Sequence, residues 1–171
     1  MTENFDPEWL KLRESVDHRS RASAAISLLK LAWKRNEWSR IVDLGSGTGS
    51  NVRYLSPRLP GAKQWTLVDH DIKLFDRLEK RDSFGEVACI VGDLADVGID
   101  VIRDCRAELV TGSALLDLVS KEWLTSLSMC CREVSCAAYF ALTYDGTVKW
   151  QFDDGLENTV EPDDEFIRQA V

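Results

Sequence analysis

The sequence has little of what marks a secreted, membrane-spanning or metal-binding protein. Its two histidines, His18 and His70, lie far apart, and its five cysteines form no C-x-x-C pair. Neither a metal site nor a disulfide framework is therefore expected, and the thiols are expected to be reduced. No apolar run approaches the roughly 20 residues that span a bilayer. The charged N-terminal residues do not resemble a secretory signal peptide, so we expect a cytoplasmic protein with no membrane partner.

Positive charge is also scarce. The chain has 21 lysine and arginine residues against 29 aspartate and glutamate residues, a formal net charge of -8. Such a surface repels a phosphate backbone, which argues against nucleic acid as a partner. With 44% hydrophobic and 29% charged residues in a chain of 171, the composition is typical of one globular domain.

Short apolar runs alternate with segments of helical periodicity. Apolar residues at three- and four-residue steps predict helices over 20–33, 51–59, 72–80 and 122–132. Buried-strand patterns occupy residues 41–44, 65–69, 87–91, 107–111 and 137–143. This alternation predicts an α/β three-layer sandwich with a mostly parallel sheet of five strands.

The alternation breaks after the fifth predicted strand. Asp145-Gly146 predicts a two-residue hairpin turn, so residues 147–152 are expected to return as a short antiparallel strand. An acidic loop follows, and residues 163–171 begin what looks like another helix. An uncovered edge strand favours pairing with another chain, so a homodimer through this edge is one expectation.

Three glycines, at positions 45, 47 and 49, stand between the first strand and its helix in RIVDLGSGTGSNVRYL. In an open α/β sheet, ligands bind outside the carboxyl ends of the strands. A turn without Cβ atoms lets a ligand approach the backbone, and the next helix points free N–H groups at it. The glycine turn is therefore predicted to form a binding site.

An acidic residue ends the second strand, twenty positions beyond Gly49. A carboxylate at this place, that of Asp69, can accept hydrogen bonds from the 2′- and 3′-hydroxyls of a ribose. The alternative is that Asp69 or Asp71 caps the following helix. With the glycine turn upstream, the ribose role is the favoured interpretation.

The glycine spacing distinguishes two classes of nucleoside site. The dinucleotide fingerprint G-x-G-x-x-G needs its third glycine where Ser50 stands. The turn is instead D-x-G-x-G-x-G from Asp43, which resembles motif I of the class I S-adenosylmethionine-dependent methyltransferases. TLVDHD, VGDLADV and LVTGSALLDLVS resemble the later motifs of that family, in chain order. The resemblance implies a Rossmann-like fold, S-adenosylmethionine as cofactor, and methyl transfer to a small-molecule acceptor, as in bacterial small-molecule members.

The resemblance also implies cofactor contacts. Asp43 would reach the ammonium group, the backbone of the glycine turn would lie against the amino acid part, and Asp69 would hold the ribose. Asp93 and Leu94 would flank the adenine. The expected cofactor-binding residues are Asp43, Gly45, Ser46, Gly47, Gly49, Asn51, Asp69, His70, Asp93, Leu94, Gly112 and Ser113, the last two near the sulfonium.

The N-terminal segment WLKLRESVDHRSR resembles a helical lid found in some bacterial members. There, Arg13 or Arg21 could pair with the methionine carboxylate; the alternative is a solvated helix face. The chain is accordingly interpreted as one domain, with a lid over 1–38, a cofactor-binding core over 39–152, and an acidic loop with the start of a helix over 153–171.

The acceptor side is less defined. Asp117 is a candidate general base, His70 is a further catalytic candidate, and Tyr144, at the carboxyl end of the fifth predicted strand, could contact the acceptor. Asp117 could equally be a helix N-terminal acid, His70 could shape the ribose loop, and Tyr144 could pack in the hairpin. Complete family members have seven strands, so their C-terminal strands are expected to be missing here. Two other functions remain open: an NAD-dependent oxidoreductase, and a non-catalytic cofactor-binding or partner subunit.

Overall fold

A computed structural model describes residues 6–61, 63–79, 81–142, 150–151 and 157–158. Five strands within these ranges form one parallel sheet, in the order β3-β2-β1-β4-β5. They are β1 (Arg40–Leu44), β2 (Gln64–Asp69), β3 (Glu86–Val91), β4 (Leu109–Ser113) and β5 (Ala137–Ala141). The predicted parallel α/β sandwich is confirmed.

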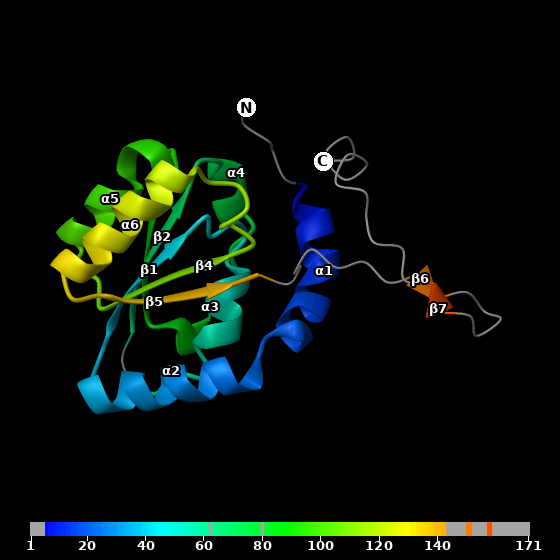
Figure 1. Ribbon diagram of the computed structural model, residues 1–171, viewed down its shortest axis with the longest axis horizontal. Helices are drawn as coiled ribbons and strands as arrows, with labels where there is room; N and C mark the ends of the chain where they lie inside the picture. The colour runs from blue at the N-terminus through cyan, green and yellow to red at the C-terminus, as the bar shows by residue number, and fades with distance from the viewer. Residues whose placement is uncertain (1–5, 62, 80, 143–149, 152–156, 159–171) are drawn as a thin grey trace.

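Helices cover both faces of this sheet (Figure 1). The elements on one face include α2 (Ser23–Asn36) and α3 (Ser50–Leu55), which bury Trp33 and Leu55 in a shared core with Trp65 of β2. The other face carries α5 (Leu94–Asp104) and α6 (Lys121–Glu133), whose core includes Ile102 and Leu127. The remaining helices are α1 (Pro7–Ser20), α4 (Ile72–Phe75) and a short 3₁₀ turn, Asp82–Phe84.

The strand order reverses at β1. From β1 the chain crosses to β2 on one side, and after β3 it returns to place β4 on the other side. The glycine turn after β1 therefore lies at the switch point of the sheet, where ligands of open α/β proteins bind.

Two helices are shorter than predicted. Helix α3 ends at Leu55 rather than at residue 59, because Pro57 has no N–H to continue the hydrogen-bond ladder. Helix α4 ends at Phe75 rather than at residue 80. Beyond it, the Arg77 and Leu78 amides donate to carbonyls three residues back, at 3.1 and 3.0 Å, which is the tighter pattern of a 3₁₀ turn.

Helix α5 is not among the predicted helices. Asp93 caps it by accepting from the Ala95 amide at 2.9 Å, and Val101 and Ile102 bury its inner face. The following strand starts two residues later than predicted, at Leu109 rather than residue 107. The Ala107 amide instead donates to the Ile102 carbonyl at 3.0 Å and closes the helix.

The predicted return strand does not pair with β5 in the ranges that the structure describes. Strand β6 (Trp150–Gln151) pairs antiparallel with β7 (Glu157–Asn158), in a separate two-stranded sheet. The predicted turn at Asp145-Gly146, Tyr144 and the helix at 163–171 lie outside the described residues. The homodimer through this edge stays a prediction. Of the helices in the described ranges, none is long and apolar enough to cross a bilayer.

Candidate cofactor site

The glycine turn has a backbone that other residues adopt with difficulty. Gly45, Gly47 and Gly49 have φ values of 61°, 53° and 82°, all in the left-handed region. The Ser46 amide donates to the Val68 carbonyl at 3.1 Å and so ties the turn to the end of β2. The glycines are therefore required by the shape of the turn, which carries its backbone past the ends of β1 and β2.

Gly49→Ala tests this requirement. An added Cβ would overlap Leu78 Cδ1 as well as strain the backbone, whereas Gly61 has a similar φ of 83° with nothing within 4 Å of an added Cβ. We expect Gly49→Ala to lower the free energy of unfolding by about 2–4 kcal/mol, from the backbone strain together with the overlap with Leu78. Gly61→Ala, the matched control, should lower it by about 1 kcal/mol. Urea denaturation measures both, and equal losses would contradict a packing role for Gly49.

Asp43 lies at the base of the turn and is completely buried. Its Oδ1 accepts hydrogen bonds from Asn51 Nδ2 at 2.7 Å and Thr111 Oγ1 at 2.6 Å. Its Oδ2 is buried without a hydrogen-bond partner among the described residues. Burial raises the pKa of Asp43, against the opposing hydrogen bonds of Thr111 and Asn51 and the charge of Arg21. A cationic ligand at Oδ2 would satisfy this oxygen and stabilise the charged carboxylate.

Arg21 supplies the opposite charge. It follows the last residue of α1, is 9% exposed, and reaches the carboxyl ends of the strands. Its Nη1 donates to Asn51 Oδ1 at 2.6 Å and its Nη2 to Ser113 Oγ at 3.2 Å, while its guanidinium lies 4.2 Å from the Tyr54 ring centroid. Its Nε is buried without a partner within the described ranges. A buried cation with a spare donor is suited to an anionic ligand group.

Asp69 holds the glycine turn in place. Its Oδ2 accepts from the Gly47 amide at 2.8 Å and its Oδ1 from the Asp71 amide at 3.0 Å. His70 Nδ1 lies 3.5 Å from Oδ1, with its side chain 34% exposed. Asp71, rather than Asp69, caps α4 by accepting from the Lys73 amide at 2.9 Å. Each oxygen of Asp69 keeps acceptor capacity for a ribose hydroxyl.

The other predicted cofactor residues have structural contacts of their own. Asp93 is exposed and caps α5, and the Leu94 carbonyl accepts from Trp123 Nε1 at 2.9 Å. Gly112 is buried, and a Cβ there would come within 2.8 Å of Phe140. These contacts explain the residue types at positions 93 and 112 without a ligand, so their cofactor roles stay predictions.

Two of the three predicted acceptor residues, Asp117 and His70, lie within the described residues. Asp117 is exposed in the turn before α6, whose N-terminal cap is Ser120. His70 stands beside Asp69, and Tyr144 lies outside the described residues. Their catalytic roles stay predictions.

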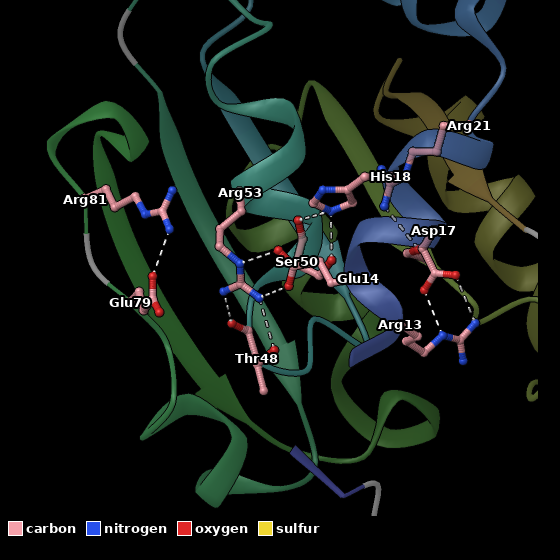
Figure 2. A network of polar contacts seen from close by, with 11 residues as sticks. Arg13, Glu14, Asp17, His18, Arg21, Thr48, Ser50, Arg53, Glu79 and Arg81 are labelled. Atoms are coloured by element: carbon pink, nitrogen blue, oxygen red, sulfur yellow. Dashed lines mark hydrogen bonds and ion pairs between the residues drawn. The ribbon is translucent and has the colours of Figure 1, made fainter. Parts of the chain in front are cut away.

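Helix α1 makes polar contacts with α3, the helix that follows the glycine turn (Figure 2). Glu14 forms an ion pair with Arg53, which also donates to the Thr48 carbonyl at 2.6 Å. His18 Nε2 lies 3.0 Å from Ser50 Oγ. Burial opposes the charge of Glu14, but the hydrogen bond and charge of Arg53 outweigh it and hold the pKa of Glu14 below its usual range. None of the residues in α1 is fully buried, so this ion pair and these hydrogen bonds contribute to the docking of the helix.

Arg13 takes a different place from Arg21. It forms an ion pair with Asp17 at 2.8 Å (Figure 2). Its guanidinium lies 4.5 Å from the Trp9 ring centroid. Both partners belong to α1. Of the two arginines proposed for the methionine carboxylate, Arg21 is therefore the one that the structure brings to Asn51 and Ser113.

A cavity of about 560 Å³ opens between α1 and the segment after α4. Its lining carries both signs of charge, with several of the residues already paired to one another. It is lined by Pro7, Glu8, Lys11, Glu14, Ser15, His18, Thr48, Arg53, Arg77, Glu79 and Arg81.

Comparison with known proteins supports the fold. No protein-family model and no curated protein matches the sequence. Among solved structures, an S-adenosylmethionine-dependent methyltransferase from Clostridium acetobutylicum ATCC 824 matches with a TM-score of 0.55 and 13% identity, over 85% of this chain and 64% of that one. The chain has the fold of that methyltransferase. It spans less than two thirds of that protein's length.

Two further matches are weaker. The plantazolicin methyltransferase BpumL, solved with SAH, has a TM-score of 0.46 and 17% identity, over 68% of this chain and 47% of that one. A SAM-dependent methyltransferase from Archaeoglobus fulgidus has a TM-score of 0.42 and 19% identity, over 72% and 52% of the two chains.

Proposed function

We propose that the chain binds S-adenosylmethionine and transfers its methyl group to a small-molecule acceptor. The observation that carries the proposal is the pair of unsatisfied buried atoms beside the glycine turn, Asp43 Oδ2 and Arg21 Nε. A buried acceptor on an acid and a buried donor on a base suit the ammonium and the carboxylate of an amino acid. The methyltransferase fold of the match from Clostridium acetobutylicum supports the same cofactor.

In this proposal the chain mainly positions its ligands. S-adenosylmethionine supplies an activated methyl group on a sulfonium centre. Asp43 binds the ammonium group, Arg21 the carboxylate and Asp69 the ribose hydroxyls, while the turn at 45–49 lies against the amino acid part. The work of the protein in such a displacement is to align the acceptor with the methyl group and to exclude water. The net charge of -8 favours a small-molecule acceptor over a nucleic acid.

Thermal denaturation tests cofactor choice, because a ligand that binds the folded state raises the melting temperature. We expect S-adenosylhomocysteine to raise it and NAD to leave it unchanged. The reverse result would favour an oxidoreductase and overturn the proposal. Incubation with S-adenosylmethionine and a panel of hydroxyl and amine compounds then tests turnover. Binding without any methylated product would favour a non-catalytic cofactor-binding subunit.

We also propose that α1 acts as a lid over the site. It contacts α3 through the ion pair of Glu14 with Arg53, and none of its residues is fully buried. A hydrogen bond to a charged group contributes about 1.5–3 kcal/mol. We therefore expect Glu14→Gln to expose α1, with trypsin cleavage after Arg13 and Arg19 about tenfold faster.

The control is Glu79→Gln, which removes an exposed ion pair with Arg81. It should leave the cleavage of α1 unchanged. Mass spectrometry of timed digests measures both variants. If Glu14→Gln is cleaved no faster than Glu79→Gln, the ion pair does not hold the lid.

A further inference from the structure

Asn51 joins the two charged residues of the site. It lies in the first turn of α3, is 2% exposed, and uses both ends of its amide. Its Oδ1 accepts from Arg21 at 2.6 Å, and its Nδ2 donates to Asp43 Oδ1 at 2.7 Å. One buried amide therefore connects a cation from the α1–α2 junction with an anion from β1.

The connection is directional. An amide in this orientation presents its acceptor to the cation and its donor to the anion, so it stabilises both charges at once. The remaining anchors fix each partner from another side: Ser113 Oγ lies 3.2 Å from Arg21 Nη2, and Thr111 Oγ1 donates to Asp43 Oδ1 at 2.6 Å. Each charged group then keeps one buried atom without a partner in the described part of the chain, Nε of Arg21 and Oδ2 of Asp43.

We infer that Asn51 is a positioning residue that makes the site selective for a zwitterionic amino acid end. This inference rests on the proposed function and specifies how the cofactor's amino acid end is recognised. Asn51 links the residue that carries the spare donor to the residue that carries the spare acceptor, and Ser113 and Thr111 anchor the two from their other sides. A ligand that carries both an ammonium and a carboxylate satisfies both atoms, whereas a ligand with one of the two leaves a buried charged group unsatisfied.

The hydrogen bonds that run from Arg21 through Asn51 to Asp43, here called the relay, also make two events interdependent: the binding of the ligand's carboxylate and the binding of its ammonium group. Arg21 belongs to the junction that carries α1, and it reaches Asp43 through Asn51. Because the relay connects them, loss of either ligand group should disturb the binding of the other. Ligands that lack the amine, the carboxylate or both should therefore bind the unmodified chain with similar, weakened affinity.

Calorimetric titration of the full chain provides the test. The probes are S-adenosylhomocysteine, its deaminated and decarboxylated analogues, and 5′-methylthioadenosine, which lacks the whole amino acid end. For the unmodified chain we expect tight binding of S-adenosylhomocysteine. The other three should bind at least about tenfold more weakly, within threefold of one another, in line with the loss of a hydrogen bond to a charged group. If the loss of affinity for 5′-methylthioadenosine equals the combined losses for the deaminated and decarboxylated analogues, the two groups are recognised independently and the relay is overturned.

Two variants separate positioning from stability. Asn51→Asp keeps an acceptor for Arg21 but places a second carboxylate beside Asp43, and Asn51→Ala removes both bonds. Both variants should bind S-adenosylhomocysteine at least about tenfold more weakly than the unmodified chain does. Their affinity for 5′-methylthioadenosine should stay within about twofold of that of the unmodified chain. Ser56→Ala, the control, alters a buried hydroxyl at the other end of α3 that has no partner in the described residues. It should change neither affinity.

The outcomes distinguish the inference from the proposed function. If the unmodified chain binds none of the adenosyl compounds, the proposed function fails. If it binds S-adenosylhomocysteine and 5′-methylthioadenosine equally well, the amino acid end is not recognised, and the roles proposed for Asp43 and Arg21 fail together with that of Asn51. If the unmodified chain prefers S-adenosylhomocysteine but the Asn51 variants weaken the binding of both ligands equally, only the positioning role fails. Should the variants not fold, the analogue series on the unmodified chain still decides the question.

Discussion

Asp69→Asn should weaken S-adenosylhomocysteine binding at least about 100-fold, the largest effect expected of a single isosteric change. Two ribose hydrogen bonds to a charged acceptor each contribute about 1.5–3 kcal/mol. The change also disturbs the turn itself, because the carboxylate accepts from the Gly47 and Asp71 amides at 2.8 and 3.0 Å. One of those two amides would face the NH₂ group of the asparagine rather than an acceptor. Calorimetric titration measures the loss.

The matched control lies two residues away. Asp71→Asn keeps a good N-cap for α4, because asparagine accepts from the Lys73 amide as aspartate does. It should bind S-adenosylhomocysteine within twofold of the unmodified chain. Equal losses of affinity in the two variants would mean that the loop that carries Asp69 and Asp71 acts by its overall charge. The ribose role of Asp69 would then have to be abandoned.

Asp43→Asn is expected to separate stability from binding. Without a negative charge, the residue no longer attracts an ammonium group, so the affinity for S-adenosylhomocysteine should fall at least about tenfold. The variant should nevertheless melt at a higher temperature near neutral pH, because burial raises the pKa of Asp43 and its charged form destabilises the ligand-free fold. A gain in stability with a loss of function is common at binding sites.

The stability difference between the unmodified chain and Asp43→Asn should depend on pH. Because the pKa of Asp43 is raised in the fold, the destabilisation is absent below the ordinary aspartate pKa of about 3.9. It grows as the pH rises above that value and is complete above the raised pKa. Thermal melts of the two proteins should therefore coincide near pH 4 and diverge toward pH 7. A variant that is less stable than the unmodified chain at pH 7 would show that the charge of Asp43 is satisfied within the fold.

The glycine turn and its strand were accessible from the sequence because their signals are local. Glycines 45, 47 and 49 are needed for backbone angles that only a few neighbouring residues determine. The buried strand before them is a continuous apolar run interrupted only by Asp43. Local chemistry also indicated Asp69, which the structure places beside Gly47.

The resemblance indicated an N-terminal lid, but the contacts of α1 were not accessible, because they depend on pairs distant in the chain. Glu14 and Arg53 are 39 residues apart, and neither carries a local signal for the other. Helix α5 was missed although its signals are present: Asp93 is a capping residue, and apolar residues at 94, 97, 101 and 102 follow at helical spacing. The same segment, VGDLADV, resembles an adenine-binding motif, and that resemblance by itself does not indicate a helix.

The most direct test of the account is a calorimetric titration of the full 171-residue chain with S-adenosylhomocysteine, repeated with Asp69→Asn. We expect saturable binding of one molecule per chain by the unmodified protein and binding at least about 100-fold weaker by the variant. An absence of heat with the unmodified chain, or undiminished binding by Asp69→Asn, would contradict the claim that the glycine turn and its neighbouring carboxylate form an adenosyl cofactor site.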